Sequence, residues 1–191
     1  MTDFEYKKLW AYVIGLAIGD GNLSNPNGRA VKLRISCCTD YPNLILRVVS
    51  SLRAFLPKNK VSIIKRPSKC VDVYVHSNTL ESLLGWKVGL GPKHKQNVGI
   101  PDWIKQDRRF VLACLKGLLE TDGSSYTDRG YKMVNFVTII PRLANEVMAI
   151  ITELGFKPHL YLFKQRTSVK HTIRVSKDCD KFIELINFYK N

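Results

Sequence analysis

The stretches "VIGLAIGDG" (residues 13–21) and "LKGLLETDG" (residues 115–123) follow one pattern: an apolar run with glycine at its third position and Asp-Gly at its end. The second copy begins 102 residues after the first. A pattern that recurs at a long fixed offset is typical of an internal duplication. The chain between and after the two copies should therefore repeat as well.

The predicted elements recur in the same order after each copy. An alternating strand is followed by a segment with helical apolar spacing, then by a basic hairpin, then by a short helix. Their ranges are 31–38, 44–56, 61–75 and 78–84 in the first half, and 131–139, 143–156, 161–175 and 179–186 in the second. Each half is predicted as helix, two strands, helix, two strands, helix. Because hairpins favour antiparallel pairing, the predicted class is α+β with two antiparallel sheets.

The halves are predicted to be residues 1–98 and 99–191, packed as one compact unit with a pseudo-two-fold axis. Their junction is expected around residues 91–110, where glycine, proline and charged residues cluster.

Composition points to a polyanionic partner. Thirty lysines and arginines face sixteen acids, for a net charge of +14, and a surface this basic favours nucleic acid. The chain has no run of four basic residues and no basic amphipathic end, so a membrane partner is not expected. Five cysteines without a Cys-x-x-Cys pair, no signal core and no long apolar run predict an intracellular protein. A bacterial or archaeal cytoplasm and an organelle both fit.

Small residues line one face of each motif segment. In helices, Gly15 and Gly19 share a face, and the second copy has Ala113, Gly117 and Thr121 at the same spacing. A mid-helix glycine costs about 0.5–1 kcal/mol relative to alanine, so a packing gain should offset it. We therefore expect the two helices to pack against each other with their backbones close.

Such packing would bring Asp20 and Asp122 together at the ends of the two helices. A helix C-terminus carries partial negative charge and two neighbouring carboxylates repel, so the pair should take up a proton or bind a cation. Mg²⁺ is the expected ion, and Mn²⁺ or Ca²⁺ would suit the same oxygen ligands. On a basic protein this predicts phosphodiester chemistry. The alternative is that each Asp-Gly only stops a helix and starts a turn.

The two motifs, "IPDWI" before the second motif and "TDGS" at its end resemble the LAGLIDADG homing endonucleases in their single-chain, double-motif form. The likeness covers almost the whole chain. It implies a monomer shaped as a saddle, whose two four-stranded sheets straddle the DNA major groove. It also implies intron-encoded, metal-dependent cleavage of both strands of a long asymmetric target. By position, Asp20 and Asp122 would hold the metals, and Gly19 and Thr121 would lend backbone carbonyls.

The resemblance also implies basic side chains near the scissile phosphates. Lys93 stands where the family often has a site lysine and is the candidate for stabilising the developing charge, with Lys95 as a substitute. The alternative for Lys93 is a solvated loop lysine. The sequence departs from the family at Cys38 and Thr39, and at Ile139 and Ile140, where polar or basic residues are common.

Basic side chains on the predicted strands and their turns are candidate DNA contacts, to bases or to phosphates. They are Lys32, Arg34, Lys65, Arg66 and Lys69 in the first half, and Lys132, Lys164, Arg166, Lys170 and Arg174 in the second. Alternation puts Lys32 with Arg34, and Lys170 with Arg174, on common faces.

Two further functions fit the same fold. One is an RNA-binding maturase acting on a host intron, which makes intron RNA a second candidate partner. The other is a DNA-binding regulator that does not cut. The departures at the site favour these readings, whereas the retention of both aspartates favours the nuclease.

Overall fold

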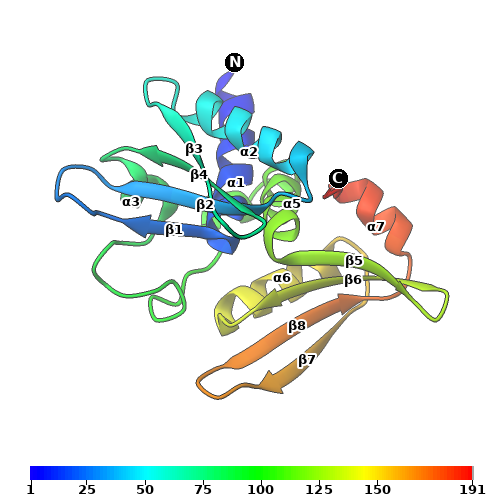
Figure 1. Cartoon of the computed structure of the whole chain (residues 1–191). Coiled ribbons are helices and arrows are strands. Elements are labelled where there is room, and N and C mark those ends of the chain that lie inside the picture. The colour runs from blue at the N-terminus through cyan, green and yellow to red at the C-terminus, as the bar shows by residue number, and fades with distance from the viewer. Residues whose placement is uncertain (191) are drawn as a thin grey trace.

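The computed structural model describes residues 1–190 and consists of two similar halves (Figure 1). The first half runs α1 (Asp3–Gly19), β1 (Gly21–Ser24), β2 (Lys32–Cys38), α2 (Pro42–Phe55), β3 (Val61–Lys65), β4 (Cys70–His76) and α3 (Leu80–Leu84). The second runs α4 (Asp102–Lys105), α5 (Arg108–Asp122), β5 (Gly123–Asp128), β6 (Tyr131–Thr138), α6 (Pro141–Glu153), β7 (Pro158–Lys164), β8 (Val169–Val175) and α7 (Cys179–Ile186).

Each half contains one antiparallel four-stranded sheet. The strand orders are β1-β2-β4-β3 and β5-β6-β8-β7, so in both sheets the first, second, fourth and third strands of the half lie side by side. The predicted α+β class with two antiparallel sheets is confirmed. Figure 1 shows α1 and α5 meeting between the two sheets, with α2 beside the first sheet and α6 beside the second.

Strand alternation gives each sheet a buried face and an outward face. In β2, Leu33, Ile35 and Cys37 are buried, while Lys32 and Arg34 point the other way and are half exposed. The inward side chains pack under the helices as part of one continuous core that also contains α1 and α5. Since one face is buried, the register is fixed, and so is the set of side chains that face outward.

Local signals position the two central helices. Thr2 accepts a hydrogen bond from the Glu5 backbone and Glu5 reaches back to the Thr2 backbone, which forms a capping box at the start of α1. Asp107 caps α5 through the Arg109 backbone N–H. Both helices therefore start at defined residues and arrive at the centre with a fixed phase.

The junction between the halves is packed against the core. It contains α4, whose Trp103 lies with its ring centroid 4.9 Å from that of Trp10 in α1. The Trp10 indole N–H donates to the Leu83 carbonyl, 2.9 Å away. The first contact ties the predicted linker to α1, and the second ties α1 to the end of α3. Within residues 1–190, no helix combines the length and the apolar content that crossing a bilayer requires.

Candidate functional site

The centre of the molecule is a seam where the backbones of α1 and α5 touch. A methyl group added at Gly15 would lie 2.1 Å from the Cys114 carbonyl oxygen, and one at Gly117 would lie 2.4 Å from the Tyr12 carbonyl oxygen. Side chains larger than hydrogen do not fit at either position. The structure thus brings together the small-residue faces that the sequence pattern pairs.

The two motif aspartates lie at the same end of this seam. Asp20 is the C-cap of α1 and Asp122 is the last residue of α5. A methyl group at Gly19 would come within 3.4 Å of an Asp122 carboxylate oxygen, so Asp122 lies against the residue that precedes Asp20.

The glycines after the aspartates, Gly21 and Gly123, are required for lack of space and not for a left-handed backbone conformation. A C-terminal glycine usually adopts a left-handed conformation, but neither Gly21 nor Gly123 has positive φ. Instead, a side chain at Gly21 would strike the Ala17 carbonyl oxygen at 2.3 Å, and one at Gly123 would strike the Leu119 carbonyl oxygen at 2.4 Å. Glycine therefore lets each strand leave directly across the end of its helix.

Two lysine ammonium groups cap the carbonyls at the ends of these helices. Lys93 Nζ donates to the carbonyls of Ala17 (3.1 Å), Ile18 (2.5 Å) and Gly19. Lys190 Nζ donates to the Thr121 carbonyl, 3.0 Å away. Lys93 follows the last helix of its half and so does Lys190, so the two halves supply equivalent cations. The sequence interpretation missed Lys190, although its place after α7 mirrors that of Lys93 after α3.

Burial perturbs all four charged groups at this end of the seam. It raises the pKa of Asp122 to about 7, helped by the charge of Asp20 and opposed by Lys93 and Lys190. It raises the pKa of Asp20 as well, against the same two lysines. Burial lowers the pKa of Lys93 to about 8 and lowers that of Lys190, while the two carboxylates oppose both shifts. Paired groups with opposed shifts in a partly enclosed site are typical of catalytic centres.

The oxygen atoms at this end of the seam suit a hard divalent cation. They are the carboxylates of Asp20 and Asp122 and the carbonyls of Gly19 and Thr121, which the lysines reach. No group of three or more His, Cys, Asp or Glu side chains suited to a metal occurs among residues 1–190. Mg²⁺ that is held by one or two carboxylates usually keeps several waters, so an ion bound by Asp20 and Asp122 would have positions open for water or a phosphate oxygen.

Cavities connect this end of the seam to the outward faces of both sheets. One of about 410 Å³ is lined by Lys93, His94, Asp122, Gln165 and Lys170. Another, of about 430 Å³, is lined by Lys93 together with Asn22 of β1. Lys93 borders both cavities, so Lys93 and the neighbouring Asp122 lie between the two outward faces.

The outward face of the first sheet carries a charged cluster around Asp72. Arg66 donates through Nε to this buried carboxylate (2.5 Å), Ser36 donates to it (2.7 Å), and Arg34 lies 3.9 Å away. Burial opposes ionisation of Asp72, but the bonds from Arg66 and Ser36 and the nearby arginines keep its pKa below the ordinary value. Lys32 lies 4.1 Å above the Tyr74 ring. These contacts hold the basic groups in fixed directions.

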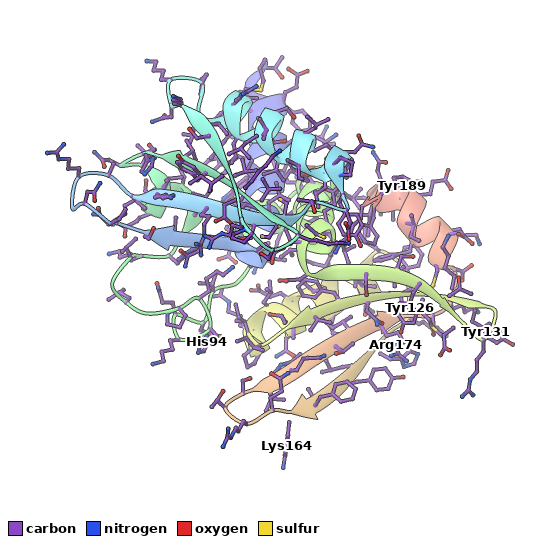
Figure 2. All side chains as sticks on the ribbon, in the orientation of Figure 1. His94, Tyr126, Tyr131, Lys164, Arg174 and Tyr189 are labelled. Atoms are coloured by element: carbon purple, nitrogen blue, oxygen red, sulfur yellow. The ribbon has the colours of Figure 1, made fainter. Side chains whose placement is uncertain are left out.

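The second sheet holds Arg174 in a comparable way with neutral partners. Arg174 Nε donates to the side-chain oxygen of Asn135 (3.1 Å), and the guanidinium lies 4.9 Å from the Tyr161 ring centroid. Asn135 in turn donates to the Tyr126 hydroxyl, 3.1 Å away. Figure 2 shows Arg174 and Tyr126 over the same part of the sheet.

The structure does not bring every predicted basic side chain to the outward faces. Lys65 pairs with Val71 across the ladder, and Lys164 pairs with Val169, so both share the inward side. Lys132 also lies on that side and forms an ion pair with Asp180 of α7 at 2.6 Å. Lys164 projects away from the end of β7 (Figure 2). Lys69 and Arg166 lie in the hairpin turns, and Lys69 is 3.6 Å from Asp40.

The positions where the sequence departs from the LAGLIDADG pattern lie at strand ends near the site. Cys38 ends β2 on the outward face, and the Thr39 backbone N–H donates to the Lys69 carbonyl at 3.3 Å. Ile139 is half exposed and lines the 410 Å³ cavity, while Ile140 is buried before α6. These positions give the site no basic groups.

Comparison with known proteins identifies this architecture. Residues 109–187 match the model of the family described as LAGLIDADG-like domain. The chain is 27% identical over 194 residues to a DNA polymerase of Thermococcus hydrothermalis and 26% identical to one of Thermococcus sp. (strain GE8). Each match covers 95% of this chain but 11% of the polymerase, so the chain spans about a tenth of those relatives.

Solved structures share the fold over nearly the whole chain. Variants of the homing endonuclease I-DmoI match with a TM-score of 0.72 and 21% identity, covering 97% of this chain and 99% of theirs. I-DmoI in complex with DNA and Ca matches with a TM-score of 0.70 and 21% identity, covering 95% and 90%. Full-length DUF199/WhiA from Thermatoga maritima matches at 0.68 with 13% identity, covering 99% and 58%. At these identities, the structural likeness establishes the fold.

Proposed function

We propose that this protein is a site-specific DNA endonuclease, because residues 109–187 match the model of the LAGLIDADG-like domain and the whole chain has the fold of the homing endonuclease I-DmoI. It acts as a monomer on a long double-stranded target and cuts both strands by metal-dependent phosphodiester hydrolysis. Its working halves are residues 1–98 and 99–191. The source is an intron-encoded gene, expressed in a bacterial or archaeal cytoplasm or in an organelle.

One observation carries this proposal: the end of the α1–α5 seam pairs two acids with two lysines, one of each from either half, and desolvation shifts the pKa of all four. A double-strand cut needs two equivalent reaction centres, and this arrangement supplies matched groups for both. I-DmoI has been crystallised with DNA and with Ca or Mn, which supports DNA and a divalent cation as the partners here.

Each residue at the seam has a distinct task in this proposal. Asp20, Asp122 and the carbonyls of Gly19 and Thr121 hold the cation; Mg²⁺ is the proposed ion, and Mn²⁺ or Ca²⁺ fits the same ligands. When bound, the cation polarises the phosphate and lowers the pKa of a water molecule. Lys93 and Lys190 place positive charge beside the phosphates and stabilise the negative charge that develops there. Partial desolvation of these groups strengthens those interactions relative to bulk water.

The two outward faces determine which DNA is cut. Arg34 and Arg66 on the first sheet and Arg174 on the second are held in fixed directions, and a fixed guanidinium suits bidentate contact with guanine in the major groove. Lys32, Lys69, Arg166 and Lys170 add contacts to phosphates or bases. Because the polar partners of the arginines differ between the sheets, the two half-sites differ and the target is asymmetric.

A library experiment tests the proposal. Linear fragments with a randomised region are incubated with the protein and Mg²⁺, and the cut ends are sequenced. The expected result is a single enriched target, cut on both strands by the wild type and left whole by Asp20→Asn and Asp122→Asn. Recovery of bound but uncut fragments with wild-type protein would contradict the nuclease assignment.

A protein that binds without cutting is the second candidate function. The apolar side chains of Ile139 and Ile140 and the thiol of Cys38 favour it, because they put no basic group at the strand ends beside the site. The fold also occurs in DUF199/WhiA, so fold alone does not decide between the two. Replacing the DNA library with intron RNA tests the maturase form of this function.

A further inference from the structure

A buried ionic cluster lies beside the seam and has no part in the proposed chemistry. Its centre is Glu120 of α5, which is only 1% exposed. Glutamate side chains are rarely this buried unless they are paired. The Tyr12 hydroxyl donates to it, Arg47 of α2 lies 3.1 Å away, and Lys116 lies 3.9 Å away. A buried carboxylate needs such partners, since removing one leaves an uncompensated charge.

Arg47 has a second contact that Lys116 lacks. Its Nη2 donates to the carbonyl oxygen of Tyr189, 2.5 Å away, in the segment that follows α7. The chain reverses at Asn187, which has φ of 55°, and Phe188 is buried. Tyr189 is followed by Lys190, whose ammonium group caps the Thr121 carbonyl. Arg47 therefore ties the backbone next to Lys190 to a fixed carboxylate on α5.

The first half anchors its lysine by an unrelated device. The side-chain amide of Gln96 accepts from the Lys87 backbone N–H (3.0 Å) and donates to the carbonyls of Lys87 (2.8 Å) and Gly91 (2.7 Å). These bonds close the loop that carries Lys93. Neither anchor contacts the other, so each lysine depends on its own support.

We propose that Arg47 is a positioning residue: held by Glu120, it fixes the segment after α7 so that Lys190 reaches the end of the seam, and it thereby governs cleavage of one DNA strand. Gln96 does the same for Lys93 and the other strand. The inference rests on the proposed nuclease function and adds to it that the two cuts are supported by separate parts of the fold.

Strand-resolved cleavage tests the inference, with the selected target labelled on each strand. Lys190→Met is expected to slow one strand on the order of 100-fold, as loss of a charge-stabilising group does, and Arg47→Met to slow the same strand about 10-fold. Lys93→Met and Gln96→Leu should slow the opposite strand. Nicked DNA accumulates in every case. Lys116→Met is the matched control, because it removes a cation beside Glu120 but has no contact with Tyr189, and it should leave the strand ratio unchanged.

Two further measurements separate positioning from loss of folding. Arg47→Lys keeps the charge beside Glu120 but has one terminal nitrogen, so it should fold normally and still give the strand bias. Hydrogen exchange of a peptide containing Tyr189 and Lys190 should be faster in Arg47→Met and Arg47→Lys and unchanged in Lys116→Met.

The outcomes discriminate between the two levels of the argument. Equal slowing of both strands in Arg47→Lys, or unchanged exchange at Tyr189, would overturn the role of Arg47 while leaving the nuclease intact. A wild-type protein that binds the target but cuts neither strand would overturn the proposed function, and the strand assignment with it.

Discussion

Replacing Gly15 by alanine should separate the two central helices. The added methyl group would lie 2.1 Å from the Cys114 carbonyl oxygen and 3.0 Å from the Leu118 amide nitrogen, and both are backbone atoms that no rotamer change moves. Overpacking a core costs about 1–3 kcal/mol, and a backbone clash belongs at the upper end. Alanine regains up to about 1 kcal/mol of helix propensity. The net loss of unfolding free energy is therefore about 2 kcal/mol.

Urea unfolding measures this loss, and thermal unfolding should show a decrease in Tm of roughly 4–8 °C for a chain of this size. Gly155→Ala is the control: Gly155 has φ of 92° and no atoms near the new methyl group, so it should cost stability without affecting cleavage. Gly15→Ala should lower cleavage further than its stability explains, because Asp20 and Asp122 move apart. If Gly15→Ala proves as stable as the wild type, the backbone contact at the seam is wrong.

Three further predictions follow from the charged groups. In metal-free protein, the raised pKa of Asp122 means that unfolding free energy falls as pH rises from about 4 toward about 7, and Asp122→Asn should flatten this part of a urea-unfolding pH series; an unchanged slope would contradict the burial of this carboxylate. Lys170→Met on the outward side should lower the salt dependence of DNA binding by about one phosphate equivalent, measured by anisotropy in Ca²⁺, whereas Lys164→Met on the inward side should not; equal effects would refute the assignment of outward and inward side chains. Asp72→Asn should release the two arginines beside it and broaden base preference in its half-site by about 1–3 kcal/mol per position, read from selected libraries; unchanged preference would show that the arginines need no such support.

The repeated motif predicted the duplication and the pairing of the two central helices, because its glycine spacing and its recurrence after 102 residues can be read directly from the sequence. Alternation and hairpin signals then predicted the strands, whose succession along the chain and antiparallel pairing the structure confirms. What the local pattern left undetermined was the phase of each strand relative to the core. Lys65, Lys132 and Lys164 look like DNA contacts in sequence but lie on the inward side, since a shift of one residue reverses a side chain.

The site was predictable in part for the same reason. Asp20 and Asp122 stand at matched places in a recognisable motif, so their proximity follows from the pairing of two helices. Lys190 stands in no motif, and only the path of the chain after α7 brings its ammonium group to the Thr121 carbonyl. The pairing of Arg47 with Glu120 was even harder to predict, because the two residues are 73 positions apart in sequence and meet only in the folded chain.

The glycine contact at the centre also bears on how such a chain could diversify after duplication. With two backbones in direct contact, the helices have one permitted alignment, and drift at Gly15 or Gly117 is sterically forbidden. No comparable restriction acts on the outward side chains of the strands. The halves were thus free to acquire different surfaces while the backbone contact between α1 and α5 stayed fixed. Hybrids of unrelated halves should assemble wherever the glycines of that contact are kept.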